Sequence, residues 1–147
     1  MKILVVEDNL KIRKNIIDFF KIQGHLAEGA ENGYDALTML HAMYDIVILD
    51  INMPKMNGKE FLEKMRTTEK NVPVIALTSN STIENKAEIF ELGADDYLNS
   101  KCEFWLCIDE NERLSKQKFG SRIVFCIQKN IRSRKMEKIS SSLPRNI

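Results

Sequence analysis

A run of four aliphatic residues, Ile46 to Leu49, stops at a carboxylate, Asp50, and the turn-forming segment 51–58 follows at once. A run of this length without polar alternation is typical of a strand buried on both faces. In an open parallel sheet, the loops that leave the carboxyl ends of the strands form the crevice in which ligands collect. The sequence therefore predicts a central strand with one acid, Asp50, at that edge of a sheet.

Strand-like and helix-like segments alternate along residues 1–98. The segments typical of strands are 2–6, 25–30, 46–49, 72–77 and 95–98. Between them the pattern predicts a helix capped by Asn9 and ending near Gly24, a helix over 33–43, a helix led by Asn57 and Gly58, and a helix opened by a capping box of Ser81 and Glu84 and ending at Gly93. The apolar residues of these helices are Ile12, Ile16, Phe19 and Phe20, then Ala36, Leu37 and Leu40, then Phe61, Leu62 and Met65, and last Ala87 and Phe90.

This alternation favours an α/β fold, a doubly wound five-stranded parallel sheet with right-handed crossovers. For the strand order we adopt 2-1-3-4-5, the flavodoxin-like order known for such sheets, and we do not derive it from the sequence. In this order the first and third strands are neighbours. Glu7 and Asp8, which end the first strand, are then expected to converge with Asp50 at one edge.

Three carboxylates packed together repel one another, and the repulsion raises their proton affinity unless a cation is bound. Mg²⁺ relieves it by accepting one or two carboxylates, a carbonyl and several waters, with room left for a phosphoryl oxygen. An Asp beside Mg²⁺ is able to attack a phosphoryl donor and form an aspartyl-phosphate. Thr78, at the end of the next strand, offers a hydroxyl. A single acid at a strand end is commonly just solvated, but three acids with Thr78 close by favour phosphoryl transfer.

Several motifs carry this pattern: Val5-Val6-Glu7-Asp8-Asn9, Asp50-Ile51-Asn52-Met53-Pro54, Gly58, Ala76-Leu77-Thr78-Ser79 and Gly93-Ala94-Asp95-Asp96-Tyr97-Leu98. Over residues 1–98 they resemble the receiver domain of bacterial two-component response regulators. Thr78 and Tyr97 follow Asp50 by 28 and 47 residues, offsets that match the winged-helix branch of that family.

The resemblance implies that Asp50 is the phosphoacceptor. It makes Asp8 the more direct Mg²⁺ ligand, Glu7 a ligand largely through water, and Asn52 a ligand through its backbone carbonyl. Thr78 would hydrogen-bond the phosphoryl group.

The same resemblance makes Tyr97 a switch residue whose rotamer changes together with Thr78. It implies phosphodonors of three kinds, namely a sensor histidine kinase, a phosphotransfer protein or a small phosphodonor. The expected role is a signalling switch in a phosphorelay and not an enzyme, beyond self-phosphorylation and slow autodephosphorylation.

The pattern breaks after Asn99. Where the family has Lys-Pro, this chain has Ser100, with Lys101 one position late and Cys102 after it. A shift of one residue along a strand turns a side chain to the opposite face, so Lys101 replaces the phosphoryl-clamping lysine only if the strand ends in a bulge. The sequence therefore predicts a receiver core over 1–98 and a divergent segment over 99–147.

The net charge changes at the same place. Residues 1–98 hold 11 Lys and Arg against 16 Asp and Glu, a net charge of −5, whereas residues 99–147 hold 11 against 5, a net charge of +6. All three cysteines lie in the second segment, where their spacing fits no common zinc site. We hypothesise that this basic segment is an out-of-frame or truncated remnant of a longer regulator, which the nucleotide sequence in the other two frames around codon 99 would test.

Composition narrows the class of protein. The hydrophobic fraction of 44% and the charged fraction of 29% are ordinary for a globular domain, and no run approaches the roughly 18 apolar residues of a membrane span. The N-terminus enters a strand directly and lacks the pattern of a signal peptide, so we expect a cytoplasmic protein without membrane partners. A homodimer is possible, and no winged-helix pattern predicts DNA binding by this chain itself.

Three alternatives stay open at this stage. One is a degraded receiver that binds Mg²⁺ but switches poorly because the clamp lysine is displaced. Another is an aspartate-nucleophile phosphohydrolase, which would need a second Asp where this chain has Asn52. The weakest is flavin or nucleotide binding, because the chain has no glycine-rich phosphate loop.

Overall fold

The five predicted strands form one parallel sheet in the order β2-β1-β3-β4-β5, which confirms the expected class and strand order. The structure is a computed structural model that describes residues 1–79 and 82–99. The elements are β1 (Lys2–Val6), α1 (Leu10–Ile22), β2 (Leu26–Ala30), α2 (Gly33–Met39), the 3₁₀ turn η1 (Leu40–Ala42), β3 (Ile46–Asp50), α3 (Gly58–Thr68), β4 (Val74–Thr78), α4 (Ile83–Glu91) and β5 (Asp96–Asn99).

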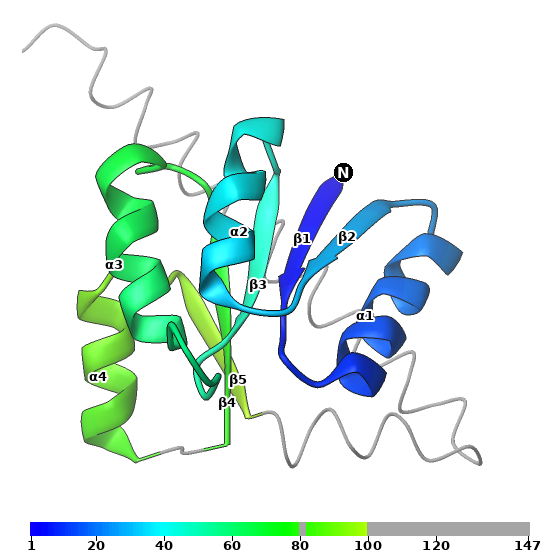
Figure 1. Cartoon of the computed structure of the whole chain (residues 1–147). Coiled ribbons are helices and arrows are strands. Elements are labelled where there is room, and N and C mark those ends of the chain that lie inside the picture. The colour runs from blue at the N-terminus through cyan, green and yellow to red at the C-terminus, as the bar shows by residue number, and fades with distance from the viewer. Residues whose placement is uncertain (80–81, 100–147) are drawn as a thin grey trace, which may run out of the picture.

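Helices cover both faces of the sheet (Figure 1), with α1 on one face and α2, α3 and α4 on the other. Side chains alternate between the faces along each strand. In β1, Ile3 and Val5 join the core under α1, whereas Leu4 and Val6 join the core under the other three helices. Every residue of β3 and β4 is buried, as the unbroken apolar runs predict.

Each α-helix begins at a polar residue whose side-chain oxygen accepts a backbone N–H of the first turn. Asn9 caps α1 and Asn57 caps α3, as the sequence predicts. The prediction for α4 was wrong by one residue: Thr82 is the cap, accepting the N–H of Asn85, while Ser81 lies outside the described residues. Both residue types favour this position, so the sequence offered two adjacent candidates.

Two further details differ from the predictions. The second helix ends at Met39 and continues as η1, which ends where Met43, with φ of 57°, turns the chain into the left-handed region. In α4 the buried apolar residue is Ile89, while Ala87 is exposed and Phe90 is 44% exposed. Phe90 instead packs edge-on against Tyr97 of β5.

The close fit of β3 against α3 depends on Gly58. A Cβ at this position would lie 2.5 Å from the carbonyl oxygen of Asp50, closer than real contacts allow. The N–H of Gly58 donates to the carbonyl oxygen of Ile51 at 3.1 Å. Glycine therefore lets α3 begin directly behind the end of β3, and it fixes the loop that follows Asp50.

An ion pair between Arg66 and Asp95 lies at the amino edge of the sheet. The Arg66 guanidinium of α3 donates to the carbonyl oxygens of Gly93, Glu69 and Val72, and it forms an ion pair with Asp95 at 3.3 Å. The Asp95 carboxylate also accepts the N–H of Val74 at 2.8 Å. This network ties α3, β4 and the turn before β5 together.

A second pair at the same edge joins β2 to the turn before β3. The buried hydroxyl of Tyr44 donates to Glu28, and the ammonium of Lys2 lies 3.8 Å from the same carboxylate and 4.9 Å from the centre of the Tyr44 ring. Burial, and after it the bond to Glu28, raises the pKa of Tyr44 above its usual value.

Among residues 1–79 and 82–99, no helix combines the length and apolar character that crossing a membrane requires. The predictions for Ser100, Lys101 and Cys102, and for the basic segment that follows them, fall outside the described residues.

Candidate functional site

The strand register brings the three predicted acids together. Val6 pairs with Leu49 across β1 and β3, so Glu7 and Asp50, the next residue of each strand path, meet at the carboxyl edge. Carboxylate oxygens of Glu7, Asp8 and Asp50 all lie within 4.8 Å of one another. Glu7 is only 4% exposed and Asp50 8% exposed, whereas Asp8 is open to solvent. The edge therefore presents one exposed and two buried carboxyl groups at a single point.

Backbone groups orient both buried carboxyls. The N–H of Asn9 donates to Glu7 Oε1 at 3.0 Å, and the N–H of Asn52 donates to Asp50 Oδ1 at 3.0 Å. The N–H of Ile51 in turn donates to the carbonyl oxygen of Leu77 in β4 at 2.9 Å. These bonds hold the carboxylates in place whatever occupies the site.

Crowding changes the proton affinity of the two buried acids. Burial, and after it the charge of Asp50, raises the pKa of Glu7 to about 9. Burial also raises the pKa of Asp50 to about 6, although the N–H of Asn52 and a hydrogen bond with Glu7 act in the lowering direction. At neutral pH the pair without a cation therefore shares one proton.

The donor set fits a hard divalent cation. A cation that binds between these carboxylates displaces the proton they hold at neutral pH, and all three groups offer the oxygen ligands that Mg²⁺ prefers. Glu7, Asp8 and Asp50 each offer one carboxylate oxygen to such an ion. The Asn52 backbone carbonyl, predicted as a further ligand, belongs to the loop that directly follows Asp50.

Thr78 lies at the end of β4, fully buried, as the neighbour of β3 at this edge. The side-chain amide of Asn85 in α4 donates to the Thr78 hydroxyl at 3.5 Å. The side chain of Asn52 reaches the same strand end, where its amide donates to the hydroxyl of Ser79 at 3.0 Å. A polar link thus runs from the loop after Asp50 across β4 to α4.

Tyr97 is half-buried on the neighbouring strand. Its ring meets Phe90 edge-on with the ring centres 6.1 Å apart, and the Lys86 ammonium lies 4.5 Å from the ring centre. Its register partner in β4 is Ala76, two residues before Thr78. The predicted switch pair is therefore on adjacent strands.

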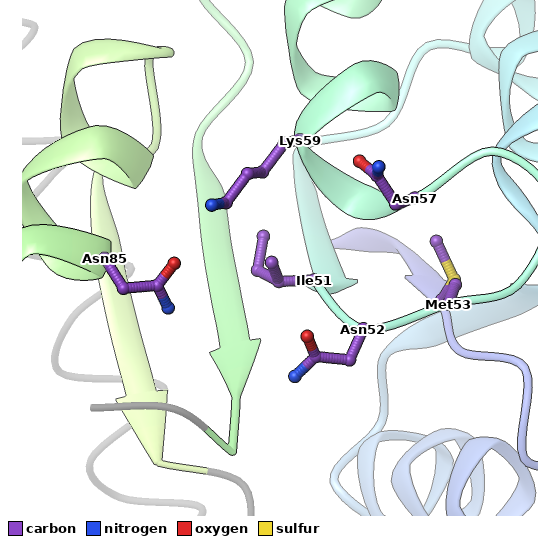
Figure 2. A pocket seen from close by; sticks show the side chains of 6 residues that line it. All are labelled: Ile51, Asn52, Met53, Asn57, Lys59 and Asn85. Carbon is purple, nitrogen blue, oxygen red and sulfur yellow. The ribbon is translucent and has the colours of Figure 1, made fainter. Parts of the chain in front are cut away.

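A cavity of about 340 Å³ opens between the loop that follows Asp50 and α4. In Figure 2, Lys59 of α3 and Asn85 of α4 point into it from opposite sides, and Asn52 lies at its lower rim. The Lys59 ammonium forms an ion pair with Glu88 of α4 at 2.6 Å. Its lining is completed by Ile51, Met53 and Asn57.

Sequence reasoning missed Asn85 and Lys59. No local motif marks either residue, because each reaches the site only through the packing of α3 and α4 on the same face. Lys101, the displaced clamp lysine, lies outside the described residues, so its role stays a prediction.

Comparison with known proteins gives a consistent result. The family model described as the response regulator receiver domain matches residues 3–104. The probable transcriptional regulatory protein SilR of Salmonella typhimurium is 40% identical over 99 residues, which is 67% of this chain and 43% of that protein. The chain thus spans less than half the length of this curated relative.

Solved structures agree. The receiver domain of the Francisella response regulator 1452 superposes with a TM-score of 0.69 at 29% identity, over 87% of this chain and 97% of that one. The response regulator TrrA of Thermotoga maritima, solved in complex with Mg²⁺ and BeF, superposes with a TM-score of 0.62 at 34% identity, over 70% and 89%.

Proposed function

The chain belongs to the response regulator receiver domain family, and from this premise we propose that it is a phosphorylatable switch whose Asp50 accepts a phosphoryl group with the help of Mg²⁺. The convergence of Glu7, Asp8 and Asp50 within 4.8 Å carries the proposal. The relative TrrA, solved with Mg²⁺ and BeF, supports it by similarity.

The roles follow from position. Asp8 and Asp50 would hold Mg²⁺ directly, Glu7 through water, and Asn52 through its backbone carbonyl. When bound, Mg²⁺ neutralises charge on the phosphoryl oxygens. The Asn52 N–H, 3.0 Å from Asp50 Oδ1, fixes the rotamer of Asp50.

The transfer step needs Asp50 as an anion. Its free carboxylate oxygen attacks phosphorus, an O–P bond forms, and the N–P bond of a phosphohistidine breaks. The electron pair leaves with the imidazole nitrogen, which takes a proton from water. With acetyl phosphate, the bond that breaks is O–P and acetate leaves. In both cases the partner is the donor, and the chain catalyses its own modification rather than turning over a substrate.

The Thr78 hydroxyl is the group that recognises the product. It donates to a phosphoryl oxygen once it turns from Asn85, its neighbour at 3.5 Å, toward Asp50. When the Thr78 side chain turns, it leaves space next to β5. The Tyr97 ring then moves into this space and away from Lys86 and Phe90. The surface of α4 and β5 then differs between the two states, and this difference is the signal.

We extend the proposal to partners and location. The donor is a sensor histidine kinase or a phosphotransfer protein in the cytoplasm, and the receiver of the signal is a protein that contacts α4 and β5, with a second copy of the chain as one possibility. Relatives such as SilR are named as transcriptional regulators. We propose no DNA contact for residues 1–98.

The test is phosphorylation in the full chain. Incubation with Mg²⁺ and acetyl phosphate should add the mass of one phosphoryl group to the wild type, and none to Asp50→Asn or in excess chelator. An equal gain in wild type and Asp50→Asn would contradict Asp50 as the acceptor. Mg²⁺ binding without any gain would favour the degraded receiver, in which the displaced Lys101 fails as a clamp.

A further inference from the structure

Arg13 of α1 reaches back to the end of β1. Its Nη1 atom donates to the carbonyl oxygen of Glu7 at 2.7 Å and lies 3.4 Å from the carbonyl oxygen of Asp8. Its backbone N–H donates to the carbonyl oxygen of Asn9 at 2.9 Å. One residue therefore contacts all three carbonyl groups of the acidic loop, defined here as residues 7–9.

Two further polar groups of the acidic loop are bound as well. The N–H of Glu7 donates to the carbonyl oxygen of Ala30 in β2 at 3.1 Å, and the side chain of Asn9 accepts the N–H of Ile12 at 3.1 Å. With the Arg13 contacts, these bonds hold the peptide planes of the loop from both sides. The directions in which the Glu7 and Asp8 carboxylates leave the chain are set by these planes.

Gly29 of β2 provides the space that Arg13 uses. A Cβ at Gly29 would lie 2.8 Å from Cδ of Arg13 and 2.8 Å from Cδ1 of Ile17. The Arg13 stem thus crosses β2 directly over the glycine backbone on its way to the acidic loop. The backbone at Gly29 is ordinary extended strand, so an added methyl would displace the side chains above it and leave the strand path intact.

From these contacts, and resting on the proposed function, we propose that Arg13 is a positioning residue of the metal site. Its guanidinium fixes the acidic loop so that the carboxylates of Glu7 and Asp8 meet that of Asp50. Gly29 contributes to this positioning because the absence of a Cβ leaves room for the Arg13 side chain.

The shape of the Arg13 guanidinium, and not only its charge, matters for the proposed positioning role. A guanidinium presents several donors in a rigid plane and is able to serve two neighbouring carbonyl oxygens, whereas an ammonium is a single point charge on a flexible stem. Outer-shell partners that orient metal ligands typically change metal affinity about 10- to 100-fold when they are removed. Arg13→Lys keeps the charge and loses the planar group whose Nη1 atom contacts both carbonyl oxygens. Gly29→Ala keeps the charge and the planar group and moves them.

The experiment measures the Mg²⁺ dissociation constant of the full chain from amide NMR shifts of residues 7–9 and 50–52 during a Mg²⁺ titration, with urea unfolding recorded beside it. The variants are Arg13→Gln, Arg13→Lys and Gly29→Ala. Lys14→Gln is the matched control, since it removes the same charge from an exposed neighbouring position of α1.

We expect Kd to rise about 10-fold in Arg13→Gln and in Gly29→Ala, to rise less in Arg13→Lys, and to stay at the wild-type value in Lys14→Gln. Gly29→Ala should keep a cooperative urea transition, so it tests the inference even if Arg13→Gln unfolds. Wild-type affinity in Gly29→Ala, or in Arg13→Lys, would overturn the positioning role alone. A wild-type chain that binds no Mg²⁺ would overturn the proposed function together with this inference.

Discussion

The two edges of the sheet differ in how their charged side chains are arranged. At the amino edge, Arg66 and Asp95 form an ion pair that also binds backbone groups of β4 and of the turn before β5. At the carboxyl edge, Glu7, Asp8 and Asp50 crowd together, and no ion pair from the described residues reaches them. The amino edge holds the fold together, while the carboxyl edge keeps a repulsion that a bound cation relieves. Substitutions at the two edges should therefore change stability in opposite directions.

The largest effect is expected at the amino edge. Arg66→Ala should lower the free energy of unfolding by about 3 kcal/mol, because it removes the ion-pair partner of the largely buried Asp95 carboxylate and the hydrogen-bond donor of several carbonyl oxygens. Urea unfolding measures it. Lys64→Ala, at an exposed position of the same helix, should change the value by less than about 0.5 kcal/mol. Equal losses of stability in the two variants would show that the Arg66 network at the amino edge does not stabilise the fold.

At the carboxyl edge, Asp50→Asn should stabilise the folded protein in chelator at pH 7, by about 1 kcal/mol, since it removes one of three repelling acids from a crowded functional site. Asp18→Asn on the exposed side of α1 serves as the control and should have almost no effect. A destabilised Asp50→Asn would mean that the Asp50 carboxylate is held by favourable contacts that outweigh the repulsion.

The dependence of protein stability on pH should also reflect the repulsion between the acids of the carboxyl edge. The pKa of Glu7 is raised from 4.5 to about 9 in the folded state, so the folded chain binds more protons than the unfolded chain between these values. Stability in chelator should therefore fall as pH rises from about 5 to 9. Saturating Mg²⁺ should flatten this decline. Urea midpoints at several pH values measure both, and a rise in stability over that range without metal would contradict the raised pKa.

The smallest effect is expected for Tyr44→Phe. It removes the hydrogen bond from the buried hydroxyl to Glu28 and keeps the ring, so the loss should be about 1 kcal/mol or less. Because Glu28 remains half-exposed, water replaces part of the lost bond. A loss as large as that of Arg66→Ala would show that the Lys2, Glu28 and Tyr44 contacts are as important as the Arg66 network.

Local patterns were sufficient for most of the fold. The unbroken apolar runs of β3 and β4 predicted strands buried on both faces, and Asn9 and Asn57 marked helix starts. The start of α4 was misplaced because Ser81 and Thr82 are adjacent and both residue types cap helices. Its buried face was missed because one turn of helix contains three apolar residues, and only packing against α3 and the sheet selects Ile89.

In the candidate site, too, some residues could be predicted from the sequence and others could not. The acids could be predicted because each directly ends a strand, and strand ends meet at one edge once the strand order is given. Asn85, Lys59 and Arg13 come from helices, and the residues that they contact are set by how each helix lies on the sheet. No spacing in the sequence marks such contacts, and the same is true of Arg66, whose carbonyl partners carry no side-chain signal.

The proposed metal site lies at the carboxyl edge, where Glu7, Asp8 and Asp50 converge. Thermal unfolding of the full chain in Mg²⁺ and in chelator tests it most directly, with Asp8→Asn as the variant and Asp18→Asn as its matched control. We predict that Mg²⁺ raises the Tm of the wild type and of Asp18→Asn but leaves Asp8→Asn nearly unchanged. The same Tm in Mg²⁺ and chelator for the wild type would show that the chain binds no Mg²⁺, and an equal rise in all three proteins would show that Asp8 is not a ligand.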